Sequence, residues 1–125
     1  MKFKTLMIIK AMASILVAIL ILGVPKFFYG LLGLTLDAAE IYPAWGYGAC
    51  LVGNALLTWH GRYAKESKGR RAIIKGMTAY NTIGFILTVI ASLNGMLNVL
   101  GWGAAAIYLF FAIGFGYFWL KPPTP

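Results

Sequence analysis

The feature that most constrains this chain is an apolar run from Leu6 to Val24, which only Lys10 interrupts. A helix needs about 20 consecutive apolar residues to cross the hydrocarbon core of a bilayer, and this run has that length. The rest of the chain is similar in character, since 61% of its 125 residues are hydrophobic and 11% are charged. A soluble domain of this size could not bury so much apolar surface. The sequence therefore predicts a single membrane domain over residues 1–125.

Four apolar runs predict spanning helices, at about 6–25, 44–60, 73–93 and 99–120. Trp45 and Trp59 bracket the second run, and Trp102 and Trp119 bracket the fourth, as is typical of aromatic side chains at the two membrane interfaces. The uncharged turn Asn94–Asn98 separates the last two runs. The predicted fold class is all-α, an integral membrane four-helix bundle with both termini on the inner side.

The first run has a second interpretation, as a cleaved signal peptide, because Lys2 and Lys4 precede its apolar stretch. The stretch ends at Pro25 and Lys26 without a small-residue cleavage motif. We therefore expect a helix that is retained in the mature protein.

The segment between the first two runs is too short and too polar to span again. We expect Phe27–Tyr42 to lie in the headgroup region as a short interfacial segment. Asp37 and Glu40 have the spacing of a capping box, which predicts a helix that begins after Asp37. Pro43 fits the first turn of a helix but not its deep interior.

Lysine and arginine are distributed very unevenly between the two predicted sides. Ten of the eleven lie beside one set of helix ends, and only Lys26 lies at the other. Because short cytoplasmic loops carry the excess of Lys and Arg, we expect a bacterial-type plasma (inner) membrane protein with both termini cytoplasmic. This explains the net charge of +8 without a nucleic-acid partner. The connection between the second and third runs, which we call the basic loop, holds Arg62, Lys65, Lys68, Arg70, Arg71 and Lys75.

Small and polar residues recur at helical spacing within the runs. In lipid, close packing and polar contacts hold helices together, so small residues are expected at helix interfaces. The candidates for this packing role are Gly46, Cys50, Gly53, Gly84, Ala112 and Gly116. The candidates for interhelical polar contacts or for the lining of a ligand site are Asn54, Asn81, Thr88 and Ser92. Asn54 and Asn81 lie at similar depths, about 9 Å from the inner ends of their runs, so we expect them to meet.

The chain offers no constellation of catalytic or metal-binding residues. The single histidine, His60, lies ten residues from the single cysteine, Cys50, which is about 15 Å along a helix and too far for a shared metal. No Asp or Glu lies inside a run, whereas small multidrug exporters need a membrane-buried carboxylate. Apart from Lys75 at the start of the third run, Lys10 is the only charge within a run, and we expect its long side chain to reach the inner interface. We therefore predict a protein that is not an enzyme.

Several short motifs resemble those of the small bacterial four-helix membrane proteins known as DoxX-like. The residues that carry this resemblance are Pro25, the stretch 29–34, the turn 92–95, the stretch 98–102 and the stretch 114–118. The resemblance implies a four-helix bundle and, for some members, proximity to quinone-linked redox systems.

Three functional hypotheses follow from these observations. The first is an accessory or assembly subunit that packs into a homo-oligomer or a larger membrane complex. The second is a binder or carrier of a small hydrophobic molecule, such as a quinone or a lipid, although no cofactor site is evident. The third is a small transporter or channel.

Overall fold

The computed structural model describes residues 1–121 of the chain, which form five helices. These helices are α1 (Phe3–Gly23), α2 (Pro25–Leu31), α3 (Ala38–His60), α4 (Lys68–Leu93) and α5 (Leu100–Leu120). Residues 1–121 contain no strand, so the predicted all-α class is confirmed.

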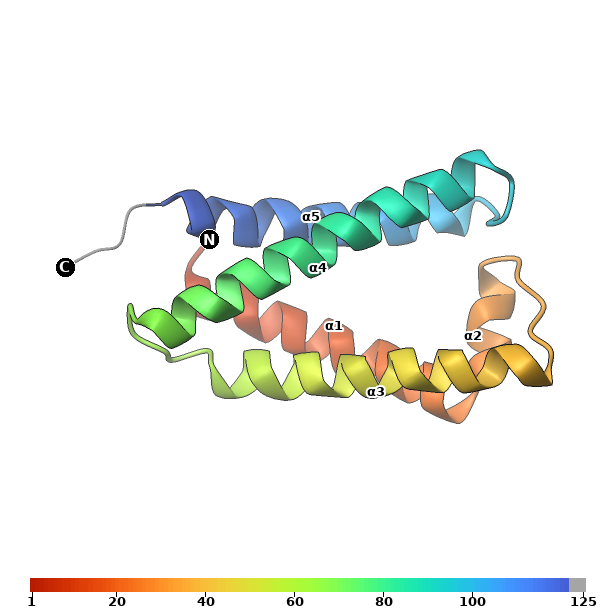
Figure 1. The fold of residues 1–125 in the computed structure, drawn as a ribbon, viewed down its shortest axis with the longest axis horizontal. Coiled ribbons are helices and arrows are strands. Elements are labelled where there is room, and N and C mark those ends of the chain that lie inside the picture. Colours follow the sequence, from red (N-terminus) through yellow and green to blue (C-terminus); the bar gives the residue numbers. More distant parts are fainter. Residues whose placement is uncertain (122–125) are drawn as a thin grey trace.

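The four long helices form two antiparallel pairs, α1 with α3 and α4 with α5 (Figure 1). The N-terminus, the α3–α4 connection and the end of α5 lie at one end of the molecule, which we call the basic end. Helix α2 and the α4–α5 turn lie at the opposite end, which we call the α2 end.

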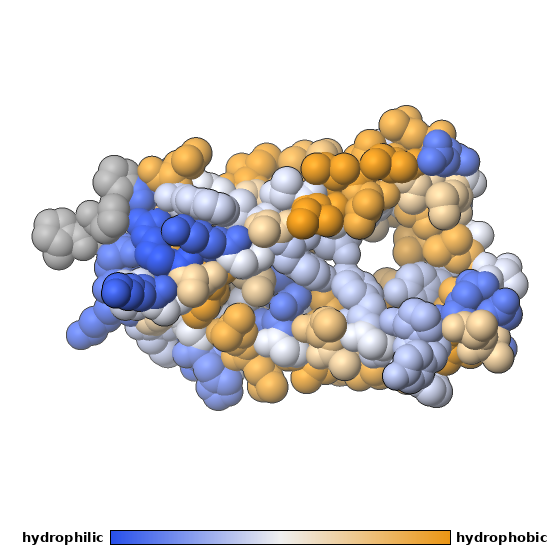
Figure 2. Space-filling view, viewed as in Figure 1, coloured by the Kyte–Doolittle hydropathy of each residue, from blue (hydrophilic) through white to orange (hydrophobic). Residues whose placement is uncertain are grey.

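Three of the helices, α1, α4 and α5, are long and apolar enough to cross a membrane. Large apolar side chains such as Leu16, Ile19, Leu87 and Ile113 are exposed on them. Apolar surface extends over both helix pairs (Figure 2). Such a surface suits a lipid environment, because in water it would be a large exposed apolar patch. The chain is therefore a multi-pass membrane protein.

Helix α3 is long enough to span but is less apolar than the other three. It has 23 residues and starts at Ala38, six residues before the predicted span at 44–60. Its hydropathy is reduced by aromatic, glycine and amide residues such as Trp45, Gly46, Tyr47 and Asn54, so it does not count among the three apolar spans. The predicted segment Phe27–Tyr42 contains most of the short helix α2, an irregular stretch and the first residues of α3.

The start of α3 confirms one prediction and corrects another. Asp37 is the N-cap, and its side chain accepts a hydrogen bond of 3.0 Å from the backbone N–H of Glu40. Because the helix begins at Ala38, Pro43 lies inside it rather than in its first turn. The expectation for Pro43 was therefore wrong, and the helix continues although the proline lacks the N–H that would bond to the carbonyl of Ala39.

The bundle is packed tightly only toward the basic end. There α1, α4 and α5 share one buried cluster, which consists of Phe3, Leu6, Met7, Ile74, Met77, Phe111, Phe115 and Phe118. Toward the α2 end, the buried cluster comes from α1 and α3 alone and consists of Ala18, Ile21, Ala44 and Leu51. The two helix pairs therefore share a core at one end and diverge toward the other.

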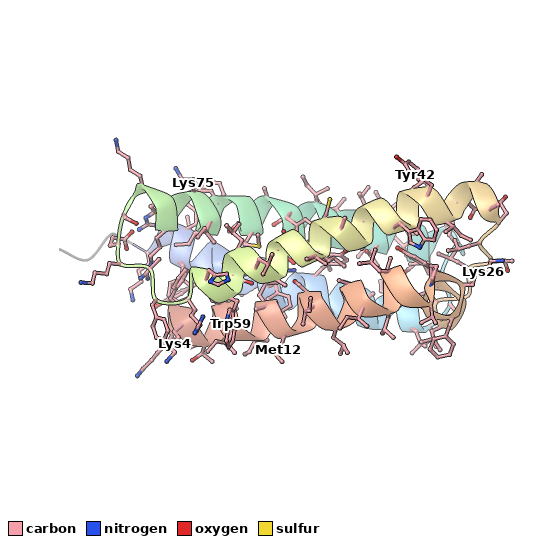
Figure 3. All side chains as sticks on the ribbon, turned by 90° about the horizontal axis from the view of Figure 1, so that it is seen from below. Lys4, Met12, Lys26, Tyr42, Trp59 and Lys75 are labelled. Carbon is pink, nitrogen blue, oxygen red and sulfur yellow. The ribbon has the colours of Figure 1, made fainter. Side chains whose placement is uncertain are left out.

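Basic side chains gather where the predicted inner ends lie. Lys4 and Lys75 lie at the basic end with Trp59, whereas Lys26 and Tyr42 lie near the α2 end (Figure 3). The uneven distribution of charge along the sequence thus becomes a difference between the two ends of the folded molecule.

The basic loop is shorter than predicted. Helix α4 begins at Lys68 because Ser67 caps it, accepting a hydrogen bond of 3.2 Å from the N–H of Arg70. Arg62 and Lys65 lie in the connection, whereas four members of the predicted loop belong to α4: Lys68, Arg70, Arg71 and Lys75. The sequence pattern missed this start because the apolar part of the helix begins only at Ala72.

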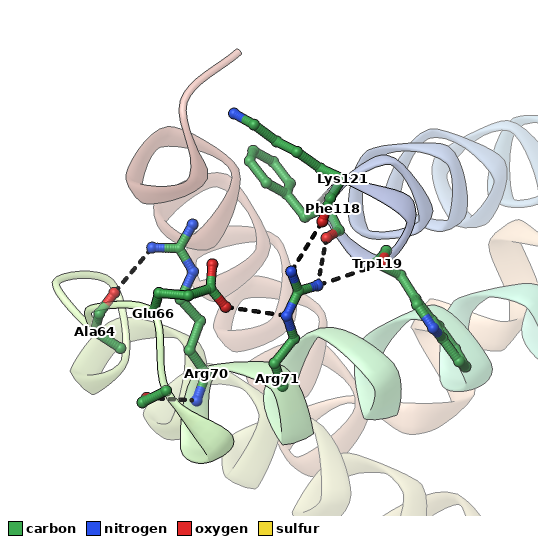
Figure 4. Close-up of polar contacts among 8 residues, drawn as sticks. Ala64, Glu66, Arg70, Arg71, Phe118, Trp119 and Lys121 are labelled. Atoms are coloured by element: carbon green, nitrogen blue, oxygen red, sulfur yellow. Dashed lines mark hydrogen bonds and ion pairs between the residues drawn. The ribbon is translucent and has the colours of Figure 1, made fainter. Parts of the chain in front are cut away.

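Arg71 joins the start of α4 to the end of α5 (Figure 4). Its guanidinium donates hydrogen bonds to the backbone carbonyls of Phe118 (2.8 Å), Trp119 (3.3 Å) and Lys121 (2.9 Å). It also forms an ion pair of 3.0 Å with Glu66. The last carbonyls of a helix have no partner within the helix. Arg71 therefore serves as a C-terminal cap of α5 as well as a positive charge at the basic end.

Candidate ligand-binding cavity

A cavity of about 590 Å³ lies between the two helix pairs, where they diverge toward the α2 end. Helices α1 to α5 all contribute to its wall, which is mostly apolar. Figure 2 shows an opening between the two helix pairs, toward the α2 end. The turn after α2 and the start of α5 meet beyond the cavity, where the Asn98 side chain donates a 2.9 Å hydrogen bond to the carbonyl of Leu31.

Three tyrosines from three helices bring their hydroxyl groups together in the cavity wall. Tyr47 of α3 shares a hydrogen bond of 2.7 Å with Tyr80 of α4, and it also bonds to Tyr108 of α5. A buried tyrosine hydroxyl needs a polar partner, and here each one finds it in another tyrosine. This cluster joins the two helix pairs in the region where they share no buried core.

Lys10 lies in the wall of the same cavity. Its residue surface is only 4% exposed, and its ammonium group donates a 3.4 Å hydrogen bond to the side-chain oxygen of Asn81. The ammonium also lies 4.7 Å from the ring centre of Tyr80 and 4.9 Å from that of Phe111. The expectation that Lys10 reaches the inner interface was therefore wrong. It lies on the same face of α1 as the buried residues Leu6, Ser14 and Ile21, which directs it inward.

The two asparagines that were expected to meet do not bond to each other. The Asn81 side chain accepts from Lys10 and donates a 2.8 Å hydrogen bond to the carbonyl of Met77. The buried side-chain nitrogen of Asn54 has no hydrogen-bond partner among residues 1–121. Similar depth along two helices gave no information on which helix faces meet.

Of the other two polar candidates, Thr88 and Ser92, only Thr88 lies in the cavity wall. Thr88 lines the cavity, and its hydroxyl donates a 2.7 Å hydrogen bond to the carbonyl of Gly84. Ser92 lies outside the lining, near the α4–α5 turn. Of the four candidates, Asn81 and Thr88 therefore belong to the cavity, and Asn54 and Ser92 do not.

Three of the predicted packing residues face away from the bundle. A Cβ atom at Gly46 or Gly53 would meet nothing within 4 Å, and Cys50 is exposed. Their predicted place in the interior of this chain was wrong. The face of α3 that packs on α1 instead carries Gly48, where an added Cβ would lie 2.9 Å from Leu22. Both stripes have helical spacing, so spacing alone did not distinguish them.

The predicted small residues of the other pair lie nearer to a neighbouring helix. The backbone at Gly84 approaches α5 so closely that an added Cβ would overlap the ring of Tyr108. Ala112 is half-buried, and an added Cβ at Gly116 would make an ordinary contact of 3.9 Å with Thr78. Gly84 is therefore the member of the predicted set whose lack of a side chain matters most.

No carboxylate of residues 1–121 lines the cavity. Asp37 caps α3, Glu40 lies in the first turn of that helix, and Glu66 pairs with Arg71.

Burial raises the pKa of the Tyr29 phenol, and the neighbouring Tyr108 adds to this rise. Tyr29 therefore remains a neutral hydrogen-bond donor in the wall at physiological pH.

Sequence reasoning missed the members of the site that matter most, which are Lys10 and the three tyrosines. Tyr47 lies only two residues after Trp45, near the end of its predicted run, but its hydroxyl bonds to those of two other helices. The available signal was that Tyr80 and Tyr108 lie well inside their apolar runs, where a phenol needs a partner.

Comparisons of the chain with protein-family models, with curated proteins and with solved structures give no match. The resemblance to DoxX-like proteins therefore stays a prediction.

Proposed function

We propose that this protein binds a small hydrophobic molecule in the cavity between its two helix pairs. The observation that carries the proposal is the cavity itself, with a volume of about 590 Å³. Ligand sites typically have volumes of about 300–1,000 Å³ and apolar walls with a few polar groups. The polar groups in this wall, Lys10, Asn81 and the tyrosine hydroxyls, come from four different helices and converge on one space.

The size of the cavity supports a binding role, because an empty space of this volume would be unfavourable in a packed protein. Protein interiors are close-packed, with few voids larger than a water molecule. A space of this size between the two helix pairs would forfeit many dispersion contacts unless an apolar molecule supplied them. A quinone or a lipid has the required size and character. Binding of this kind needs no catalytic group.

A cavity-filling variant tests the proposal. Ala104 is half-buried in the cavity wall, so Ala104→Phe places a ring in the binding space. Ala106 is exposed on the same helix, so Ala106→Phe adds the same ring outside the cavity. Native mass spectrometry in mild detergent should detect a retained apolar molecule on the unmodified protein and on Ala106→Phe, and much less of it on Ala104→Phe. Equal occupancy of the two variants, or no adduct on any of the three, would contradict binding in this cavity.

The proposal includes a membrane arrangement with four crossings. We propose that α3 crosses alongside α1, with both termini in the cytoplasm of a bacterial-type inner membrane. Three observations support this: α3 has 23 residues, it runs antiparallel to α1, and the basic side chains gather at the end that holds the α3–α4 connection. An excess of Lys and Arg marks the cytoplasmic side.

A second candidate function, an assembly subunit, is favoured by the outward face of α3. Gly46, Cys50 and Gly53 form a small-residue stripe there, and the described part of the chain leaves it uncovered. Small residues allow the backbones of neighbouring helices to approach closely in lipid. In that case Gly46→Leu combined with Gly53→Leu should convert a homo-oligomer or a larger complex into monomers in native mass spectrometry, whereas Gly76→Leu, also in open space, should not.

A further inference from the structure

The site contains one charge that its own residues do not balance. The Lys10 backbone lies about 10 Å along α1 from the start of that helix, given the rise per residue. Its ammonium group contacts a side-chain oxygen of Asn81 at 3.4 Å and the ring faces of Tyr80 and Phe111. None of these groups carries a negative charge. A cation in the membrane interior is normally paired or lies in a functional pathway.

No acidic side chain of the described chain can reach Lys10. The sequence has three acids. Asp37 and Glu40 lie at the start of α3 at the α2 end, and Glu66 is paired with Arg71 at the basic end. The other polar residues of the cavity wall are tyrosines, Asn81, Ser14 and Thr88, and none of them is acidic. Residues 1–121 therefore supply no countercharge to Lys10.

A second polar group beside Lys10 has no partner. Ser14 follows Lys10 by one helical turn and lines the same cavity. Its residue surface is 2% exposed, and its hydroxyl makes no hydrogen bond within residues 1–121. Buried hydroxyl groups are normally satisfied, so an isolated one in a cavity wall indicates a place for a polar ligand atom. Two donors, one of them cationic, thus lie side by side on α1.

We infer that the cavity takes a single-chain amphiphile with an anionic head, such as a fatty acid or an acidic lysolipid. This inference rests on the proposed function, because it specifies the class of molecule that the cavity binds. The head accepts hydrogen bonds from the Lys10 ammonium and the Ser14 hydroxyl, and the chain occupies the apolar space toward the α2 end. The head thereby supplies the missing countercharge.

Binding of palmitate and of methyl palmitate to the purified full-length protein in a neutral detergent tests the inference. The two probes share one acyl chain and differ in the charge of the head. At mildly alkaline pH, palmitate should bind more tightly by about tenfold or more, as expected of a charge-assisted contact in place of a neutral one. Lys10→Met should remove this preference while methyl palmitate still binds. Lys10→Arg should retain part of it.

The matched control is Lys4→Met, which removes an exposed lysine of the same helix and should leave the preference unchanged. Ser14→Ala should reduce the preference severalfold. Palmitoyl lysophosphatidic acid, compared with palmitate, shows whether a phosphate or a carboxylate is the better head. Equal binding of palmitate and methyl palmitate, or a preference that survives Lys10→Met, would overturn the inference while leaving the hydrophobic site in place. Failure of both probes to bind would instead contradict the proposed function.

Discussion

At the scale of single residues, the basic side chains of Arg71 and Lys10 make structural contacts that their charge alone does not predict. Arg71 was expected to set the orientation of the chain, and it also caps the end of α5. Lys10 was expected at the interface, and it lies buried beside Asn81. In both cases the long side chain has the reach for either role. The contact that forms depends on which neighbour the fold brings within hydrogen-bond distance.

Replacement of Arg71 should destabilise the basic end measurably. Arg71→Ala removes three bonds to carbonyls of α5 and the ion pair with Glu66. Hydrogen bonds that involve a charged group each contribute about 1.5–3 kcal/mol when buried, and partial exposure of this site reduces that amount. We expect a total loss of about 1–3 kcal/mol, measured as a lower Tm by tryptophan fluorescence in detergent.

Two comparison variants separate this cap from a general effect of charge. Arg71→Lys keeps the positive charge but cannot spread several donors over the carbonyls, so it should retain only part of the stability. Lys68→Ala removes an exposed charge from the same helical turn and should change the Tm little. If Arg71→Ala were no worse than Lys68→Ala, the capping role would be refuted.

At the scale of the helices, α4 provides a matched pair of glycines that tests the close approach to α5. Gly76 has open space at its Cβ position, whereas an added Cβ at Gly84 would overlap the Tyr108 ring. Gly76→Ala should stabilise the protein by about 0.5–1 kcal/mol, because alanine favours the helix. Gly84→Ala should instead destabilise it by about 1–3 kcal/mol through overpacking. Thermal unfolding of the two variants measures this difference, and a change of the same sign in both would contradict the observed packing of α4 on α5.

At the scale of the whole molecule, the number of crossings can be determined by labelling single cysteines. With Cys50→Ser as background, Lys2→Cys, Lys26→Cys and Lys65→Cys place one thiol at the N-terminus, one in α2 and one in the α3–α4 connection. If α3 crosses, a membrane-impermeant thiol reagent on intact cells should label Lys26→Cys alone. If α3 stayed on the outer surface, Lys65→Cys would be labelled as well. Permeabilised cells provide the control that all three thiols can react.

The sequence predicted elements better than it predicted contacts. Apolar length located the helices α1, α4 and α5, with tryptophans near both ends of α5, and the spacing of Asp37 and Glu40 located the start of α3. These signals are local, so they can be read along the chain. The partners of Asn54 and Asn81 depend on the rotation of α3 and α4 about their axes. Several stripes of small and polar residues compete for the interior, and only the packed structure shows which stripe is buried.

The opening between the helix pairs lies on the side of the molecule rather than at an end. In the proposed membrane arrangement, a molecule that enters there approaches from the acyl chains of the bilayer, not from water. The quantity that governs occupancy is then the mole fraction of the ligand among the surrounding lipids. Because amphiphiles accumulate in membranes to concentrations far above their aqueous solubility, even weak intrinsic affinity would keep the site filled. For the proposed ligand, dissociation constants are therefore best expressed per lipid, and we expect them to change with bilayer composition at constant total ligand.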